Sequence, residues 1–138
     1  IAGRTNSRVF AEYDLSPKGR ALRVGCVSDE ELRALYANAL CLIFPSLYEG
    51  FGLPPLEAMA CGCPVVVSSA ASLPEICGKA ALYCDPYNAS DLADKINLLA
   101  RNRQLRQKMR ERGLKHAKHF TWEKCARATL ASIFRILE

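Results

Sequence analysis

Two glutamates and two glycines between residues 49 and 57 form the segment of this chain that is best suited to hold a ligand. Glu49 and Glu57 have seven residues between them, and Gly50 and Gly52 lie in that interval. Glycine lets phosphates or hydroxyls approach the backbone closely, and carboxylates accept hydrogen bonds from the paired hydroxyls of ribose or a hexose. Each feature alone is common in turns and helix starts, so the interpretation depends on their combination.

The elements around this segment predict where such a ligand would lie. The continuous apolar run 40–44 predicts a strand buried on both faces. A helix is expected to begin at Pro54 or Pro55 and to stop at Gly62, which places Glu57 in its first turn. Free N–H groups and the partial positive charge at a helix start favour an anion, most naturally a diphosphate.

The rest of the chain alternates short apolar runs with amphipathic segments, which predicts an α/β fold. Such an alternation implies a Rossmann-like parallel sheet with helices on both faces, and ligands bind at the carboxyl ends of its strands. The expected strands are 21–27, 40–44, 64–67 and 80–84. The expected helices follow a cap at Ser28, Pro54–Pro55, a cap at Ser90–Asp91, the basic run around Leu105 and Met109, and a cap at Thr121.

The segment from residue 49, Glu-Gly-Phe-Gly-Leu-Pro-Pro-Leu-Glu, closely resembles the signature of the retaining glycosyltransferases of glycosyltransferase family 4. The resemblance extends over about residues 22–135 and is most specific in residues 49–66. It implies the C-terminal, donor-binding half of a two-domain GT-B fold: one nucleotide-sugar-binding domain over residues 1–138, with C-terminal helices at about 90–138. Ile1 reads like the end of a buried strand, so we expect a chain truncated at its N-terminus.

The resemblance also implies roles for individual residues. It assigns the ribose hydroxyls of the donor to Glu57, and hydroxyls near the anomeric carbon to Glu49 as the catalytic residue. It assigns sugar and phosphate oxygens to the backbone of Gly50, Phe51, Gly52 and Leu53, and the edge of the base to the backbone around Val27, from Cys26 to Ser28.

The implied reaction moves a hexose from a nucleotide-diphosphate sugar to a glycan or lipid-linked acceptor with retention of configuration, as in polysaccharide biosynthesis. The family supplies an Arg and a Lys from a loop that would precede Ile1, and an N-terminal acceptor-binding domain, so we expect no turnover from this chain alone. No Asp-x-Asp pair is present, so neither a metal nor a cofactor is implied. Two alternatives stay open: a GT-B nucleotide-sugar epimerase, and a non-catalytic interaction module of the same fold.

Composition fits a soluble domain of the cytoplasm. Half of the 138 residues are hydrophobic and about a quarter are charged, and no apolar run or signal pattern marks a membrane span or secretion. The seven cysteines are scattered, without the spacing of a zinc site. They are interpreted as reduced thiols packed in the core.

Positive charge is concentrated in one segment. Residues 101–118 contain eight basic side chains and one acid, Glu111, so the rest of the chain is mildly acidic. The simplest interpretation is a solvated helix face. The sharper one is contact with an anionic membrane surface, which would make the protein peripheral at a membrane. Nucleic acid is not expected, because no aromatic residues interleave with the basic ones.

Overall fold

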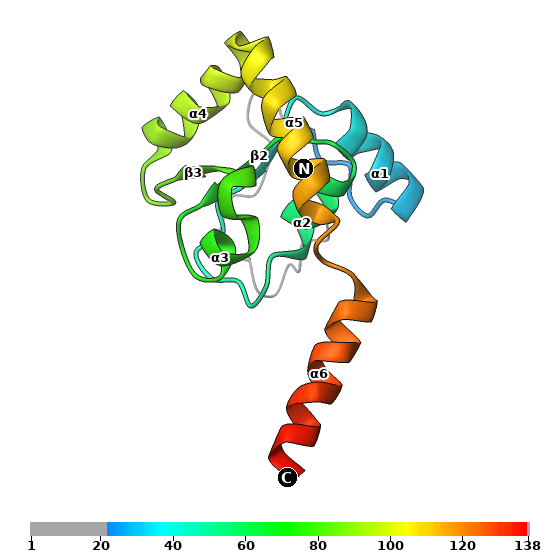
Figure 1. Ribbon diagram of the computed structural model, residues 1–138. Helices are drawn as coiled ribbons and strands as arrows, with labels where there is room; N and C mark the ends of the chain where they lie inside the picture. The colour runs from blue at the N-terminus through cyan, green and yellow to red at the C-terminus, as the bar shows by residue number, and fades with distance from the viewer. Residues whose placement is uncertain (1–21, 138) are drawn as a thin grey trace. The chain divides into compact units, whose positions relative to one another are not determined.

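The computed structural model describes residues 22–137, which fall into two units that meet between Leu35 and Tyr36 along the chain. Short strands and helices alternate through the second unit, as Figure 1 shows. The helices are α1 (Asp29–Asn38), α2 (Leu53–Ala60), α3 (Leu73–Cys77), α4 (Ala89–Arg101), α5 (Arg103–Ala117) and α6 (Trp122–Leu137). The strands are β1 (Leu42–Phe44), β2 (Val65–Ser68) and β3 (Leu82–Cys84), and a 3-10 turn covers Gly78–Ala80.

The strands form a parallel sheet in the order β1-β2-β3. Ile43 pairs with Val66, and Val67 pairs with Tyr83. All four residues of the central strand β2 are buried. This confirms the predicted α/β class, and it confirms that the runs 40–44, 64–67 and 80–84 contain parallel strands. The prediction that the run 40–44 is buried on both faces is wrong, because β1 lies at the edge of the described sheet and Ile43 is exposed.

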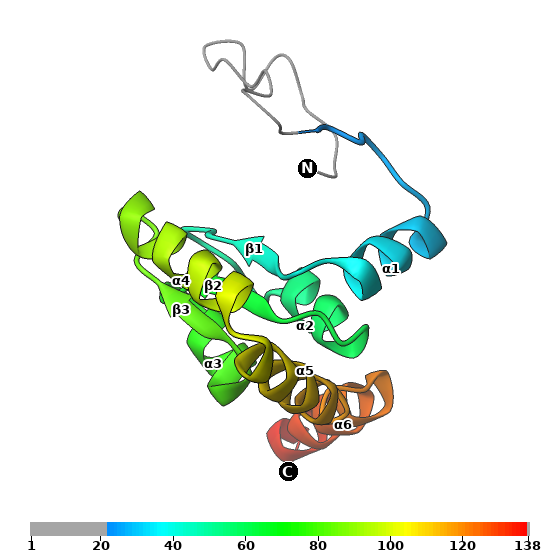
Figure 2. The same cartoon turned by 90° about the horizontal axis from the view of Figure 1, so that it is seen from above.

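Alternate valines of β2 pack into two different hydrophobic clusters. Val65 and Val67 pack in a cluster with Met59 of α2 and Leu73 of α3. Val66 packs in the other cluster, which contains Leu99 of α4 and Met109 of α5. Since successive side chains of a strand point to opposite faces, helices cover both faces of the sheet, and Figure 2 shows α3 and α4 on either side of β3.

Three local predictions were wrong or incomplete. Within the described part of the expected strand 21–27, only an isolated bridge at Gly25 is present. A strand needs a partner for its backbone groups, and the described sheet begins with β1. The short helix α3 was missed, because its few residues show no helical period.

The third concerns the cap of α4. The structure places the cap at Asn88, whose side-chain oxygen accepts from the N–H groups of Ser90 at 3.0 Å and Asp91 at 3.1 Å. Ser90 was therefore misread as the cap, and it lies inside the helix instead. The predicted caps at Ser28 and Thr121 are confirmed by hydrogen bonds to their third following N–H groups.

The seven cysteines range from buried to exposed, with Cys41 and Cys61 partly buried. Cys63, Cys77 and Cys84 are buried, and burial raises the pKa of Cys63 and of Cys77 to about 11. Cys26 and Cys125 are exposed, so the prediction that the cysteines pack in the core is wrong for these two. Both stand beside apolar residues in the sequence, but neighbours along the chain do not determine burial.

Among residues 22–137, no helix combines the length and the apolar character that crossing a membrane requires.

Candidate functional site

The candidate site is the loop of residues 45–52, which connects the end of β1 to the start of α2 (Figure 1). Because β1 and β2 are parallel, their carboxyl ends lie at the same edge of the sheet. The loop therefore lies at the edge where ligands bind in folds of this kind, as the sequence predicts.

Three serine hydroxyls hold the loop through its carbonyl groups. Ser46 donates to the carbonyl of Tyr48 at 3.2 Å, and Ser72 donates to the carbonyl of Glu49 at 3.0 Å. Ser68, buried at the end of β2, donates to the carbonyl of Ser46. The loop is thus shaped by side chains from two neighbouring segments.

The sequence analysis missed these serines as site residues. A signal existed, since Ser68 ends the central strand and Ser72 stands among small residues just after it. Their partners, however, are 22 and 23 residues away along the chain.

Gly52 is required by the backbone of the loop. It is the N-cap of α2 in the left-handed region, with φ +98°, and a Cβ on it would lie 2.8 Å from Cδ2 of buried Leu73. Gly50 differs, since a Cβ there would meet nothing within 4 Å and its φ is not in the left-handed region. One glycine of the pair shapes the loop, and the other leaves open space beside it.

Helix α2 begins earlier than the sequence predicts, at Leu53 instead of at a proline. The N–H groups without an intrahelical partner would belong to Gly52, Leu53, Pro54 and Pro55. Proline has no N–H, so the available donors of this helix start are those of Gly52 and Leu53. Glu57 consequently lies in the second turn and not in the first.

The two glutamates occupy different settings. The Glu57 side chain is exposed on α2. The pKa of Tyr36 is raised chiefly because Tyr36 is partly buried, and the negative charge of Glu57 raises it further. Tyr36, near the end of α1, is therefore a neighbour of Glu57 that no local pattern in the sequence indicates. Glu49 is half-buried in the loop, and its backbone carbonyl is held by Ser72.

Phe51 connects the loop to the segment between α5 and α6. Its ring meets that of Phe120 edge to face, with centroids 6.1 Å apart. Phe120 also contacts His116, whose Nε2 lies 2.7 Å from the carbonyl of Ile76. Since a carbonyl only accepts, this nitrogen donates, and His116 has a packing role on α5.

Two further sequence predictions concern the base and a metal. Val27 lies in the first unit, before α1, and its contact with the base stays a prediction. The described residues contain no group of three or more His, Cys, Asp or Glu side chains that could hold a metal ion.

Comparison with curated proteins finds relatives among mannosyltransferases. The O-antigen chain mannosyltransferase B of Escherichia coli is 46% identical over 107 residues, which are 78% of this chain and 28% of that protein. The MMP alpha-(1->4)-mannosyltransferase of Mycolicibacterium hassiacum is 42% identical over 110 residues, which are 76% of this chain and 26% of that protein. The chain thus spans less than a third of the length of these relatives.

Comparison with solved structures finds the same architecture. Sucrose-phosphate synthase from Thermosynechococcus elongatus matches with a TM-score of 0.76 and 30% identity, over 95% of this chain and 33% of that one. The C-terminal domain of the glycosyl transferase group 1 family protein LpcC from Francisella tularensis matches with a TM-score of 0.65 and 27% identity, over 82% of this chain and 58% of that one.

The fold is therefore that of the C-terminal domain of a GT-B glycosyltransferase. The model of the family described as glycosyl transferases group 1 matches residues 10–116, well over half of the chain. The protein whose loop, helix start and glutamates are described above belongs to the glycosyl transferases group 1 family.

Proposed function

We propose that this chain is the donor-binding domain of a retaining hexosyltransferase that uses a nucleoside-diphosphate sugar. The observation that carries the proposal is the loop 45–52, which the serine hydroxyls hold by its carbonyls at the carboxyl edge of the sheet. With its carbonyls bonded to the protein, the loop keeps the N–H groups of Gly52 and Leu53 for an anionic ligand.

The two glutamates divide the recognition of the donor in this proposal. Exposed Glu57 accepts hydrogen bonds from the ribose hydroxyls, and Glu49 contacts hydroxyls of the sugar near the anomeric carbon. Both roles suit a carboxylate, which offers two acceptor oxygens to a pair of adjacent hydroxyls. The backbone dipole at the start of α2 stabilises the negative charge that develops on the departing diphosphate.

The names of the relatives suggest mannose as the sugar. Two of the most similar relatives are described as mannosyltransferases, one of them of the O-antigen chain. We therefore extend the proposal to mannosyl transfer onto a growing glycan, with the acceptor bound by a domain outside this chain.

Calorimetry with the 138-residue chain tests the proposal through binding. UDP-, GDP- and ADP-linked hexoses, mannose among them, are titrated beside the matching free nucleoside diphosphates. A nucleotide sugar is expected to bind more tightly than its free nucleotide, because Glu49 adds contacts to the sugar. If none of these ligands binds to the folded chain, the non-catalytic interaction module becomes the better interpretation.

Two variants separate the roles of the glutamates. Glu57→Gln is expected to weaken the binding of the free nucleotide and of the nucleotide sugar equally. The expected loss of affinity is about 10- to 100-fold, the effect of one hydrogen bond to a charged group. Glu49→Gln is expected to weaken the binding of the nucleotide sugar and to leave the binding of the free nucleotide unchanged.

The control is Glu111→Gln, the same change at an exposed site on α5, where the side chain bonds to Gln107. It should leave the binding of both ligands unchanged. Equal affinities in wild type and Glu57→Gln would contradict the assignment of the ribose contact.

A further inference from the structure

A groove at the amino edge of the sheet lies outside the candidate donor site. It has a volume of about 210 Å³. Leu40 and Pro64, which precede β1 and β2, line one side, and Arg103, Arg106 and Arg110 of α5 line the other. These residues define the arginine groove, which the proposed function does not use.

The arginine groove and the candidate donor loop lie at opposite edges of the sheet. The loop follows the carboxyl end of β1, whereas Leu40 and Pro64 come just before their strands. Helix α2 begins in the loop and ends beside Gly62, which also lines the groove. Its eight residues span about 12 Å, so a ligand in the groove does not overlap one in the donor loop.

The three arginines of the groove share one side of α5. They are three and four residues apart, which is the spacing that places side chains on one face of an α-helix. Because an α-helix turns by about 100° per residue, the other basic residues Lys108, Arg112 and Lys115 lie on the opposite side. The positive charge of the arginine groove is therefore gathered in one hollow and does not continue as a flat surface.

Backbone carbonyls hold two of the three arginines in place. Nη1 of Arg106 donates to the carbonyls of Leu99 and Ala100, at the end of α4. Nη1 of Arg110 donates to the carbonyl of Gly62 at 3.3 Å, just beyond the end of α2. A guanidinium has five N–H donors, so both arginines keep donors for a ligand while these bonds limit their movement.

Within residues 22–137, no carboxylate forms an ion pair with an arginine of the groove. The ion pairs there are Lys95–Asp91 and Arg127–Glu123. Glu111, the one acid of α5, accepts instead from the side-chain amide of Gln107 at 2.7 Å. Three guanidinium groups in one hollow without a counter-ion attract an anion, and the planar fork of arginine suits one with several oxygens.

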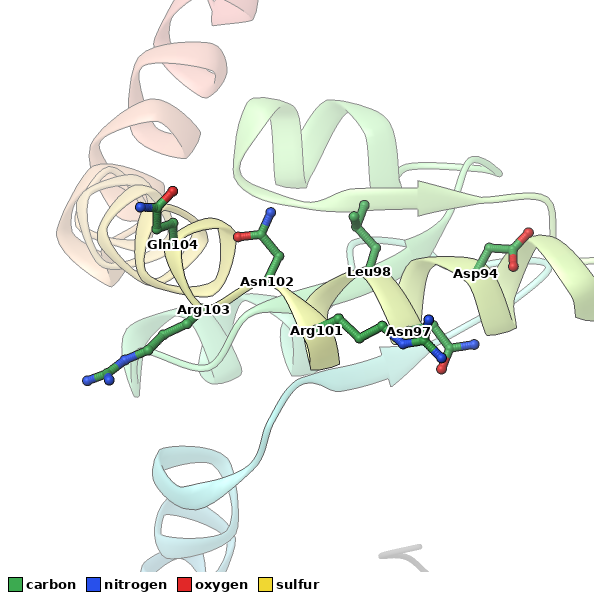
Figure 3. A pocket seen from close by; sticks show the side chains of 7 residues that line it. All are labelled: Asp94, Asn97, Leu98, Arg101, Asn102, Arg103 and Gln104. Atoms are coloured by element: carbon green, nitrogen blue, oxygen red, sulfur yellow. The ribbon is translucent and has the colours of Figure 1, made fainter.

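A neighbouring pocket shows the contrast. It lies where α4 meets α5, has a volume of about 460 Å³, and is lined by Asp94 as well as by Arg101 and Arg103 (Figure 3). In the same view the side chain of Arg103 extends away from Asn97 and Arg101. The carboxylate of Asp94 makes this pocket a poorer place for an anion, whereas the described residues that line the arginine groove include no acid.

We propose that the arginine groove binds the phosphate group of a small phosphate monoester. Such a phosphate carries about 1.5 to 2 negative charges at neutral pH and three terminal oxygens, so each oxygen can accept from a different arginine. A phosphodiester, as in nucleic acids and most phospholipids, has a single charge and fewer free oxygens. The exposed Leu40 offers an apolar contact to the carbon part of the ester.

An NMR titration of the 138-residue chain with glycerol 1-phosphate tests this proposal. The ester is expected to shift the amide signals of Leu40, Gly62 and Arg110 until the groove is saturated, because these residues line it. Dimethyl phosphate, a diester, is expected to bind at least about 10-fold more weakly, because it loses a hydrogen bond between charged groups. Equal affinities for the two compounds would overturn the assignment to a monoester.

Variants of α5 test whether the arginines form the site. Arg103→Gln is expected to weaken the binding of glycerol 1-phosphate about 10-fold, and Arg103 makes no side-chain hydrogen bond within residues 22–137 that its loss could disturb. Arg103→Gln/Arg110→Gln should weaken it about 100-fold. The matched control is Lys108→Gln/Lys115→Gln, which removes the same charge from the opposite side of α5 and should weaken binding less than about threefold. Equal losses from the two double variants would overturn the role of the groove.

Vesicles and RNA test the choice of a small monoester over other sources of phosphate. Vesicles of phosphatidylcholine mixed with phosphatidylglycerol, and an RNA oligomer with free hydroxyl ends, present only diesters. Neither is expected to displace glycerol 1-phosphate from the groove at the same concentration of phosphate. Displacement by either one would overturn the proposal, and so would shifts confined to the loop 45–52, which would place the phosphate at the donor site.

Discussion

At the scale of single residues, the candidate donor loop depends on a few atoms that fix its backbone. The hydroxyls of Ser68 and Ser72 bind its carbonyls, and Gly52 turns the chain into α2 with a left-handed backbone. The two glycines of the Gly-Phe-Gly sequence are therefore not equivalent. Gly52 adopts a backbone conformation that strains other residues, whereas Gly50 leaves free space beside the loop.

Replacing Gly52 by alanine is expected to destabilise the protein by about 1–3 kcal/mol. Alanine at φ +98° is strained, and its Cβ would press on Leu73, which is fully buried and cannot easily move. Urea unfolding measures the effect. Gly50→Ala is the control and should change the free energy of unfolding by less than about 0.5 kcal/mol. A similar loss in both variants would show that the strain does not belong to Gly52.

At the scale of elements, side chains close in sequence cap the starts of four helices, α1, α4, α5 and α6. Asn88 caps α4 and Asn102 caps α5, each through its side-chain oxygen. At the start of α2 no side chain caps the helix. Pro54 and Pro55 have no N–H group, so the free backbone donors there are those of Gly52 and Leu53.

Asn88→Ala is expected to lower the free energy of unfolding by about 1 kcal/mol, because two N–H groups of α4 lose their acceptor. The sequence favoured Ser90 as the cap, so Ser90→Ala makes an informative control. Ser90 lies within α4 with its side chain exposed to solvent, so we expect almost no change in the free energy of unfolding. Thermal unfolding of both variants decides between the two caps, and a larger effect at Ser90 would show that the sequence prediction was right.

At the scale of the whole molecule, packing around the sheet makes the half-buried Tyr83 harder to ionise. Burial raises the pKa of Tyr83 on β3 to about 12, and its hydroxyl donates to the carbonyl of Gly78 at 2.6 Å. The neutral phenol is therefore favoured in the folded state. The unfolded chain releases this proton near pH 10.

The free energy of unfolding is accordingly expected to fall as the pH rises from about 10 to about 12. Below pH 10 both states keep the proton, so the contribution of Tyr83 is complete there. Tyr83→Phe should make the free energy of unfolding fall less steeply between pH 10 and 12, by at most the slope that the release of one proton gives. At neutral pH it should lower the free energy of unfolding by about 1 kcal/mol, because a hydrogen bond is lost. Urea titrations across this pH range measure both.

Tyr48→Phe is the control for this profile, because the Tyr48 ring is 85% exposed and contributes little to the fold. It should leave both the neutral stability and the alkaline slope unchanged. Both variants keep all seven cysteines, so the comparison isolates the phenol of Tyr83. Identical slopes in wild type and Tyr83→Phe would show that the alkaline loss comes from other groups.

The sequence by itself determined the class of fold and the place of the candidate site. Continuous apolar runs at 40–44 and 64–67 predicted parallel strands, and both formed within or close to the predicted bounds, although only β2 is buried throughout. The segment from Glu49 to Glu57 followed the end of a strand, so its position at the carboxyl edge could be predicted. These features are encoded by residues next to one another, which local periodicity and spacing reveal.

Only the tertiary structure decided how the loop is held and which distant segments lie beside α5. The bonds from Ser68 and Ser72 to the loop join residues more than 20 positions apart. Arg110 of α5 likewise donates to the carbonyl of Gly62, 48 residues away along the chain. Such contacts arise when helices pack on the sheet, and because their members are distant in sequence, no local pattern announces them.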